Sequence, residues 1–273
     1  MGTRKLNVFL NSRIPSFNKT INVDPDKSLS IRSFLIASIC NNVSSVNNVL
    51  ESEDVKSTIS ACKKLGVQIK RLRPRFYIIK GKGLGSFFAK KNTKINFGNS
   101  GTLARLLIGI LTTTPNIELK ISGDHSLNKR SMEKLIYLMS KFGAVFLPKN
   151  KYTFPLKIIS SKLPIGINYK AGLSAQLKSA VILAGLNSYG TTLIEEKILS
   201  RDHTENILNK NKKSIKIKKK GKKIIEIFGK KSLNHFSINV GGDPSSAAFF
   251  TALTLLNQNS SLKIKNVGLN PTR

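Results

Sequence analysis

Four short segments of this chain resemble one another and recur about every 72 residues. Each begins with small polar residues and continues into an apolar pattern that predicts a helix; they read PDKSLSIRSFLIAS, GNSGTLARLLIGILT, GLSAQLKSAVILAGL and GDPSSAAFFTALTLL. When the segments are aligned on Ser28, Ser100, Ser174 and Ser245, the spacings are 72, 74 and 71 residues. Recurrence at such a period indicates stacked copies of one structural unit, which restricts the fold more than any other feature of the sequence.

The residues between these segments repeat as well. A second helix is predicted in EDVKSTISACKKLGV and RSMEKLIYLMSKFGAV, which both reach a glycine at their ends, and more weakly in RDHTENILNK. A strand separates the two helices of each unit, and an alternating hairpin follows them, as in VQIKRLRPRFYIIKG. Three units of helix, strand, helix and hairpin then fill residues 26–238, after an opening stretch that reads as strands. This pattern predicts an α/β fold.

A net charge of +32 raises nucleic-acid binding as an alternative function. The densest basic run, residues 210–231, alternates lysine with isoleucine and therefore reads as a hairpin with a solvated lysine face. No aromatic residue interleaves these lysines before Phe228, so the run lacks the stacking platform on which single-stranded bases are bound. We interpret the charge as a solvated surface.

The chain carries no signal of export or membrane insertion. No apolar run reaches the roughly 18 residues that a membrane span needs, and the start MGTRKLNVF has no apolar signal core. Cys40 and Cys62 both fall on apolar helical stretches, which is typical of reduced core thiols. We therefore expect a cytoplasmic protein without membrane contact.

The first helix start carries candidate anion-binding groups. Lys27 and Ser28 lie at the entrance of the predicted helix, and Arg32 follows Ser28 by one turn, so the three polar groups share one face. An arginine fork and a lysine charge suit a substrate phosphate. The alternative is an ordinary N-cap serine followed by a solvated arginine.

Two further helix starts have similar potential. Asn99 and Gly101 belong to a tight glycine loop whose backbone N–H groups can approach a small anion closely. Ser174 and Gln176 offer a hydroxyl and an amide to a sugar-like hydroxyl or a phosphate oxygen. Each start viewed alone is no more specific than an ordinary helix cap.

Two other segments place charged groups just before helices. Lys129 and Arg130 oppose the dipole of the helix that follows them, which is easier to understand if an anion lies between. In SRDHTE, a metal-binding or acid–base role for His203 is one interpretation. The other is that Asp202 and Glu205 are ordinary first-turn residues.

Seven motifs in order resemble those of the 5-enolpyruvylshikimate-3-phosphate (EPSP) synthase family: DKSLSIR, GNSGT, GDHSLNKR, SAQLKSAVILAGL, SRDHTE, GDPSSAAFF and NVGLNPTR. The resemblance runs from about residue 11 to the last residue, and SAQ is similar to the Ser-Ala-Gln branch. It implies an inside-out α/β fold of repeated βαβαββ units in two domains. Residues 26–238 would form the complete domain, whereas residues 1–25 and 239–273 would belong to a second, incomplete one.

The resemblance also implies substrate contacts at the first helix start and beyond the third. Lys27 would contact both shikimate 3-phosphate and phosphoenolpyruvate, and Ser28 and Arg32 would bind shikimate 3-phosphate. Arg201 is a further candidate for substrate binding.

At the second and third helix starts, it implies contacts to both substrates. Gly101, with Asn99 nearby, would line the phosphoenolpyruvate pocket, and Arg130 would hold the phosphate or carboxylate of that substrate. Ser174 and Gln176 would hold the shikimate moiety, with Gln176 also reaching phosphoenolpyruvate.

The implied reaction moves the enolpyruvyl group of phosphoenolpyruvate to the 5-hydroxyl of shikimate 3-phosphate, by addition and elimination through a tetrahedral intermediate. The family needs no metal or organic cofactor, and the full-length protein would be a monomer. Its acid–base carboxylates and a lysine would follow Arg273, so we expect residues 1–273 to be an inactive fragment. Two departures from the family pattern are Ser131, where proline is usual, and the sparse third helix ILNKNKKSI.

A sibling family that transfers the same group to UDP-N-acetylglucosamine is the alternative within this fold. That family usually has Lys-Asn where this chain has Lys27 and Ser28, and a cysteine on the loop that here spans residues 122–130 without one. Both differences favour the shikimate enzyme.

Overall fold

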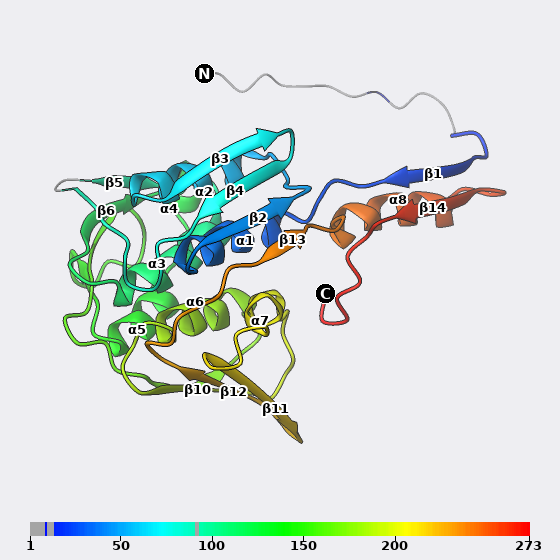
Figure 1. Cartoon of the computed structure of the whole chain (residues 1–273). Coiled ribbons are helices and arrows are strands. Elements are labelled where there is room, and N and C mark those ends of the chain that lie inside the picture. The colour runs from blue at the N-terminus through cyan, green and yellow to red at the C-terminus, as the bar shows by residue number, and fades with distance from the viewer. Residues whose placement is uncertain (1–8, 10–13, 91–92) are drawn as a thin grey trace.

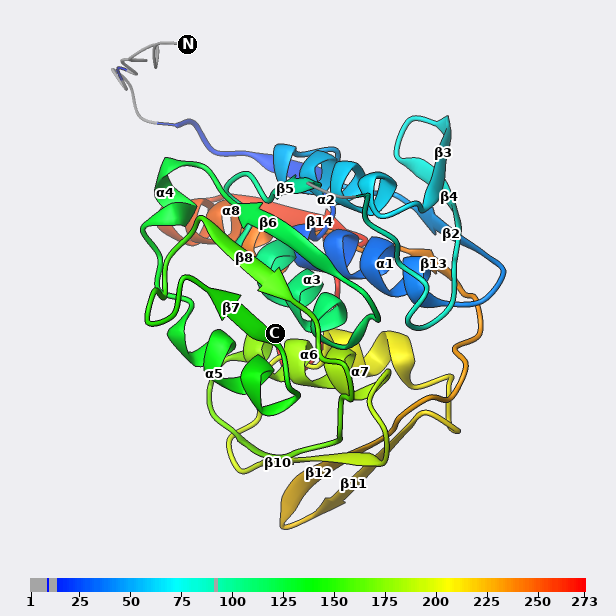
Figure 2. The same ribbon diagram turned by 90° about the vertical axis from the view of Figure 1, so that its left-hand side faces the viewer.

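The computed structural model describes Phe9, residues 14–90 and residues 93–273. Within these ranges the chain has a mixed α/β fold, in which three four-stranded sheets lie around a central group of helices (Figures 1 and 2). Each sheet combines one parallel strand pair with an antiparallel hairpin. The α/β fold predicted from the repeat is therefore confirmed.

The second and third units are continuous in sequence. The second consists of β5 (Lys94–Asn96), α3 (Gly101–Thr113), β6 (Glu118–Ser122), α4 (His125–Asn128), α5 (Glu133–Lys141), β7 (Val145–Leu147) and β8 (Leu156–Ile159). The third consists of β9 (Asn168–Ala171), α6 (Ala175–Gly185), β10 (Thr191–Glu196), α7 (His203–Leu208), β11 (Ile215–Lys220) and β12 (Lys222–Phe228). Their sheets have the strand orders β5-β6-β8-β7 and β11-β12-β10-β9.

The first unit obtains one strand from a distant part of the chain. Its continuous elements are α1 (Lys27–Ile39), β2 (Val43–Asn47), α2 (Glu53–Lys64), β3 (Gln68–Arg73) and β4 (Phe76–Lys80). The parallel partner of β2 is β13 (Ser237–Asn239), which follows the third unit, and the strand order is β13-β2-β4-β3. Strands β5 and β13 are each three residues long. So short a segment shows too little alternation of apolar and polar residues to be predicted as a strand.

The central helices α1, α3 and α6 are buried because they are apolar around most of their circumference. In α1 every residue from Ser30 to Ile39 is buried, and in α3 every residue except Arg105. Helix α3 packs against both α1 and α6, and the buried apolar side chains form one continuous core. In Figure 2 these helices lie in the middle, with the sheets around them.

The two ends of the chain form a second, smaller part of the structure. Strand β1 (Asn18–Asn22) pairs in parallel with β14 (Ser261–Lys265), and α8 (Pro244–Leu256) lies against β14, to the right of the three-sheet body in Figure 1. The rest of the predicted opening strands, up to residue 13, lies outside the described residues apart from Phe9. Helix α8 exposes an apolar face that includes Phe249, Leu255 and Leu256.

Other sequence expectations concern the thiols and the membrane. Cys40 and Cys62 are buried and unpaired, and burial raises the pKa of Cys40 to about 12 and that of Cys62 to about 11. The expected core thiols are therefore confirmed. Among the helices of the described residues, none is both long and apolar enough to cross a lipid bilayer.

Gly81 allows the end of a hairpin to cross the end of a central helix. A Cβ on Gly81 would lie 2.1 Å from the carbonyl oxygen of Cys40 and 2.6 Å from that of Ala37, both at the end of α1. The two residues after Gly81 bond to the end of α1, because the N–H groups of Lys82 and Gly83 donate to the carbonyl oxygens of Ser38 and Cys40. The glycine thus permits the last carbonyls of α1 to be satisfied.

We expect Gly81→Ala to lower the free energy of unfolding by about 1–3 kcal/mol, because the added methyl forces two backbone segments apart. Urea denaturation followed by circular dichroism measures this change. The matched control is Gly172→Ala, since a Cβ there meets nothing within 4 Å. Equal stability of the two variants would contradict the close-approach argument.

Candidate functional site

The central helices of the three units begin in the same way. Asp26, Ser100 and Ser174 are the N-cap residues of α1, α3 and α6, and each side chain accepts a hydrogen bond from the backbone N–H of a leucine three residues later. The caps are 74 residues apart in both intervals. The alignment on Ser28 is therefore displaced by two residues, because Ser28 is the second residue of α1 and Asp26 provides the cap.

Two arginines lie at the start of α3. Arg130 donates from Nη2 to Oδ1 of Asn99 at 2.6 Å, and Arg105 donates from Nη1 to the carbonyl oxygen of Gly101 at 3.2 Å. A Cβ on Gly101 would lie 2.7 Å from Nη1 of Arg105 and 3.5 Å from Nη1 of Arg130. The missing side chain lets both guanidinium groups approach the helix start, whose dipole also favours an anion.

The electrostatics of this first cationic cluster favour an anion. Burial, and then the charge of Arg130, lower the pKa of Arg105. Two cations beside a helix N-terminus repel each other and oppose the helix dipole. A bound anion would relieve both unfavourable interactions. Asn99 is oriented by Asp124, whose Oδ2 accepts from its amide at 2.9 Å.

Arg32 is the centre of a second cluster, between α1, α6 and α7. Its Nε donates to Oγ1 of Thr204 at 3.1 Å, its Nη1 to the carbonyl oxygen of Ser28 at 3.1 Å, and its Nη2 to Oγ of Ser179 at 3.5 Å. All three acceptors are neutral, and the residue is only 3% exposed. Burial lowers the pKa of Arg32 to about 10, so the group still carries its charge at neutral pH. Its two terminal nitrogens retain further N–H groups for an anionic ligand.

Gln176 contacts the first cluster and lies one helical turn from the second. Its Oε1 accepts from Nη1 of Arg105 at 3.0 Å, and its Nε2 donates to Oγ1 of Thr102 at 2.9 Å. Gln176 is the second residue of α6, three positions before Ser179, which contacts Arg32. The structure therefore brings the predicted residues of the second and third helix starts together.

Two predicted residues lie at the edge of this arrangement. Lys27 is half exposed and forms an ion pair with Asp54 of α2, the Nζ to Oδ2 distance being 3.1 Å. Arg201 is exposed before α7, and its positive charge contributes, after the dominant effect of burial, to the lowered pKa of Arg32. Both would have to reach a ligand from the surface.

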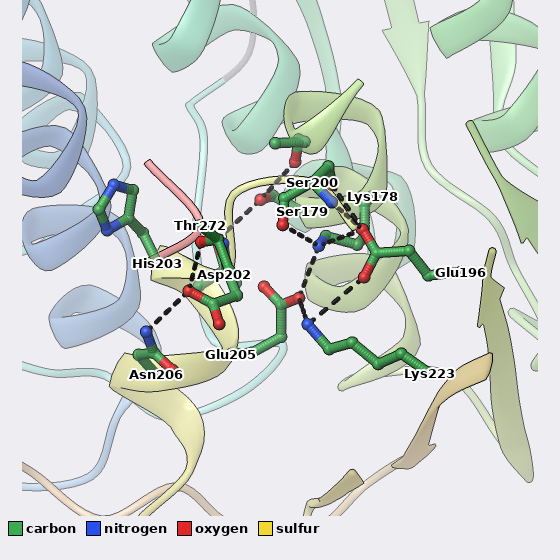
Figure 3. Close-up of polar contacts among 12 residues, drawn as sticks. Lys178, Ser179, Glu196, Ser200, Asp202, His203, Glu205, Asn206, Lys223 and Thr272 are labelled. Carbon is green, nitrogen blue, oxygen red and sulfur yellow. Dashed lines mark hydrogen bonds and ion pairs between the residues drawn. The ribbon is translucent and has the colours of Figure 1, made fainter. Parts of the chain in front are cut away.

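The segment SRDHTE forms a hydrogen-bonded turn into α7. Asp202 occupies the N-cap position of α7 without making a cap bond. Its Oδ1 instead accepts from Asn206 and Thr272 (Figure 3) and also from Asn270. Burial lowers the pKa of His203, whose Nε2 is enclosed without a hydrogen-bond partner in the described part of the chain. Over the same residues, no three His, Cys, Asp or Glu side chains are grouped as metal ligands.

Glu205 belongs to a buried quartet of charges with Lys178, Glu196 and Lys223 (Figure 3). The Nζ of Lys178 lies 2.8 Å from Oε1 of both glutamates, and the Nζ of Lys223 lies 3.1 Å from Oε1 of Glu205 and 3.4 Å from Oε2 of Glu196. The Oε1 of Glu196 also accepts from the backbone N–H and the hydroxyl of Ser200, both at 2.7 Å. Burial opposes charge, but these partners lower the pKa of Glu196 and raise that of Lys223, so both are ionised at neutral pH.

Sequence reasoning missed Arg105, Thr204 and the quartet. Arg105 and Lys178 each interrupt an apolar helical run, in TLARLLIGILT and AQLKSAVILAGL. A charged residue there has to be paired or has to face a ligand, because isolated buried charge is costly. That signal was present in the sequence, whereas the partners of these residues come from other segments and are not evident from local pattern.

Known proteins of one family are similar to this chain over most of its length. The family model described as EPSP synthase (3-phosphoshikimate 1-carboxyvinyltransferase) matches residues 13–273. Among curated proteins, a 3-phosphoshikimate 1-carboxyvinyltransferase of Novosphingobium aromaticivorans is 39% identical over 257 residues, which are 93% of this chain and 58% of that protein. A protein with the same description from Zymomonas mobilis is 36% identical, over 96% of this chain and 58% of its own length.

Solved structures show the same relationship. EPSP synthase from Acinetobacter baumannii matches with a TM-score of 0.83 and 34% identity, over 94% of this chain and 57% of that structure. The chain thus spans a little under three fifths of the length of the relatives it matches.

Proposed function

The chain belongs to the EPSP synthase family, and on this premise we propose that it binds shikimate 3-phosphate and phosphoenolpyruvate side by side at the starts of α1, α3 and α6. The observation that carries the proposal is the presence of two arginine clusters at neighbouring helix starts, Arg105 with Arg130 and the buried Arg32, with Gln176 on the first and one helical turn from the second. Two separate clusters suit two anionic substrates, and an amide placed between them suits substrates that must touch. This arrangement supports the shikimate enzyme over a general basic surface, which would not separate its charges in this way.

We assign shikimate 3-phosphate to the cluster around Arg32. Ser28 lies at the start of α1 and Ser174 at the start of α6. Lys27 and Arg201 would approach the ligand from the surface. The buried guanidinium supplies most of the attraction, because charge–charge interactions strengthen where water is excluded.

We assign phosphoenolpyruvate to the cluster at the start of α3. Gly101 and Asn99 would line this pocket, and Arg130 would hold the phosphate or carboxylate. Arg105 is added to the set because it faces the same helix start and contacts Gln176. Gln176 would then contact both substrates.

In this proposal the full-length protein transfers the enolpyruvyl group to the 5-hydroxyl of shikimate 3-phosphate and releases phosphate. Residues 26–238 form its complete domain, and residues 1–25 with 239–273 belong to a second domain that contributes the acid–base groups. The pairing of β1 with β14 supports that division. The Ser-Ala-Gln branch, the cytoplasmic location and the monomeric state belong to the same proposal.

Arg32→Ala should weaken the binding of shikimate 3-phosphate by about 1.5–3 kcal/mol, because it removes charge-assisted hydrogen bonds. This corresponds to a roughly 10- to 150-fold rise in Kd. Isothermal titration calorimetry on residues 1–273 measures the difference. The control is Arg71→Ala, which removes an arginine paired with Glu51 on the exposed β3–β4 hairpin and should leave Kd unchanged.

The alternative functions are separated by further titrations of the same protein. Random-sequence DNA should bind weakly and lose affinity steeply with added salt, and UDP-N-acetylglucosamine should not compete with shikimate 3-phosphate. Equal affinity of wild type and Arg32→Ala for shikimate 3-phosphate would show that the assignment of Arg32 is wrong.

A further inference from the structure

The residues that hold Arg32 are the chain neighbours of two members of the buried quartet. Ser179 follows Lys178 on α6, and Thr204 precedes Glu205 on α7. The Lys178 Nζ and Glu205 Oε1 atoms are 2.8 Å apart, and the side chains of both residues are at most 1% exposed. One buried ion pair therefore joins the two helices directly beside the acceptors of Arg32.

The contacts of Arg32 depend on the distance between these helices. The hydroxyl oxygens of Ser179 and Thr204 lie 2.8 Å from each other, and both accept from the guanidinium of Arg32. The Ser179 hydroxyl also donates to the carbonyl oxygen of Ala175, which holds it to α6. If α7 moved away from α6, Thr204 would lose its contacts with both Ser179 and Arg32.

Helix α7 has little intrinsic means of holding its position. It has six residues, and the side chain of its N-cap Asp202 makes no capping bond. Helices this short are not stable by themselves in water, so tertiary contacts decide where they lie. These contacts include the quartet, which links Glu205 to α6 through Lys178 and to β12 through Lys223.

We infer that the buried Lys178–Glu205 ion pair is a positioning device for Arg32: it fixes α7 against α6 and so holds the guanidinium ready for an anionic substrate. The link to substrate affinity rests on the proposed function, whereas the positioning of Arg32 does not. Lys178 and Glu205 themselves lie too deep to touch a ligand.

The test compares two double variants of the same quartet. Lys178→Met/Glu205→Gln removes the pair between α6 and α7, and Glu196→Gln/Lys223→Met removes the pair between β10 and β12. Each takes away one cation and one anion and leaves the other pair intact. The second variant is the control, because it removes the link from Glu205 to Lys223 but keeps the link from Glu205 to Lys178 that joins α7 to α6.

The first readout is solvent exchange of the Arg32 Nε–H, followed by nuclear magnetic resonance without any ligand. This hydrogen is buried and bonded to Thr204 in the wild type, so its exchange should be slow there and in the control. In Lys178→Met/Glu205→Gln it should be roughly tenfold faster or more. Slow exchange in this variant, or equally fast exchange in the control, would overturn the inference.

The second readout is the Kd of shikimate 3-phosphate in a double-mutant cycle. Lys178→Met/Glu205→Gln should raise Kd roughly tenfold in the wild-type background and hardly at all in Arg32→Ala, because the pair acts through Arg32. Equal losses in both backgrounds would refute positioning. If the wild type bound no shikimate 3-phosphate, the proposed function would fail, and the exchange comparison would still decide the inference.

A milder variant serves if the double variant does not fold. Glu205→Asp keeps the charge but shortens its reach by one methylene, so exchange and Kd should change in the same direction by a smaller factor. No change in either quantity in a folded Glu205→Asp protein would count against the ion pair.

Discussion

A polypeptide of residues 1–273 should release phosphate from phosphoenolpyruvate and shikimate 3-phosphate at no more than the background rate. Addition and elimination require proton transfer at a carbon and at a hydroxyl, and each missing acid–base group typically costs about 10²–10⁴ in rate. The clusters at the helix starts supply cations and hydrogen-bond donors, which bind and neutralise anions but do not transfer these protons.

The carboxylates around the site are already engaged. Asp26, Asp124 and Asp243 cap their helices. Asp54 pairs with Lys27, and Glu205 with the lysines of the quartet. Each of these carboxylates therefore already has a structural partner, and none is left over as the acid–base group of the reaction.

The measurement is a phosphate-release assay, first on residues 1–273 and then on a chimera. The chimera joins these residues to the remaining C-terminal part of the Novosphingobium aromaticivorans relative, which shares 39% identity with this chain. We expect turnover by the chimera and a large loss when it carries Arg32→Ala. Rapid turnover by residues 1–273 alone would show that the catalytic groups lie within that range.

Lys178→Met should lower the free energy of unfolding by about 3–5 kcal/mol, because it leaves two buried glutamates with one lysine. Thermal unfolding should show a fall in Tm of about 10 °C or more. The difference in the free energy of unfolding between Lys178→Met and the wild type should become smaller as the pH falls towards about 4. An unpaired buried carboxylate binds its proton more tightly in the folded protein than in the unfolded chain, so acid stabilises the folded variant relative to wild type.

An exposed ion pair provides the matched control for this stability change. Lys218 pairs with Glu226 across the β11–β12 hairpin, and its side chain is 49% exposed. Lys218→Met should therefore change the free energy of unfolding by no more than about 1 kcal/mol. If Lys178→Met cost as little, the quartet would not contribute the stability inferred from its burial.

The fold was largely predictable because its information is local and repeated. The helix in SAQLKSAVILAGL and the hairpin in VQIKRLRPRFYIIKG follow from apolar periodicity alone, and both are present as α6 and β3–β4. The strand β13 was not predictable in this way, because its role depends on pairing with β2 across 192 residues. The alignment on Ser28 misplaced the N-cap of the first unit, because Asp26 and not Ser28 accepts the hydrogen bond from the N–H of Leu29.

The residues of the candidate site could be predicted where a helix start carries its own polar groups. Arg130 was selected because a cation just before a helix opposes the helix dipole, although its side chain lies at the start of α3 and not at the helix that follows it. Gln176 was selected because it directly follows the start of a helix. The hydroxyl acceptors of Arg32 were not predictable, because nothing in the local sequence distinguishes Ser179 and Thr204 from other hydroxyl residues before the fold brings them together. The same holds for Glu205, whose first-turn position suggested a dipole role although its partners are lysines of other elements.

The late position of β13 has a consequence for synthesis on the ribosome. The sheets of the second and third units are each built from one continuous segment, so they can close soon after residues 159 and 228 emerge. The first unit is translated earliest, yet the outer edge of β2 stays open until residue 239 has been made. Contacts between distant segments form slowly, and an unpaired strand edge invites association with other chains. We therefore expect the nascent protein to complete its second and third units before its first, and to be most prone to aggregation during that interval.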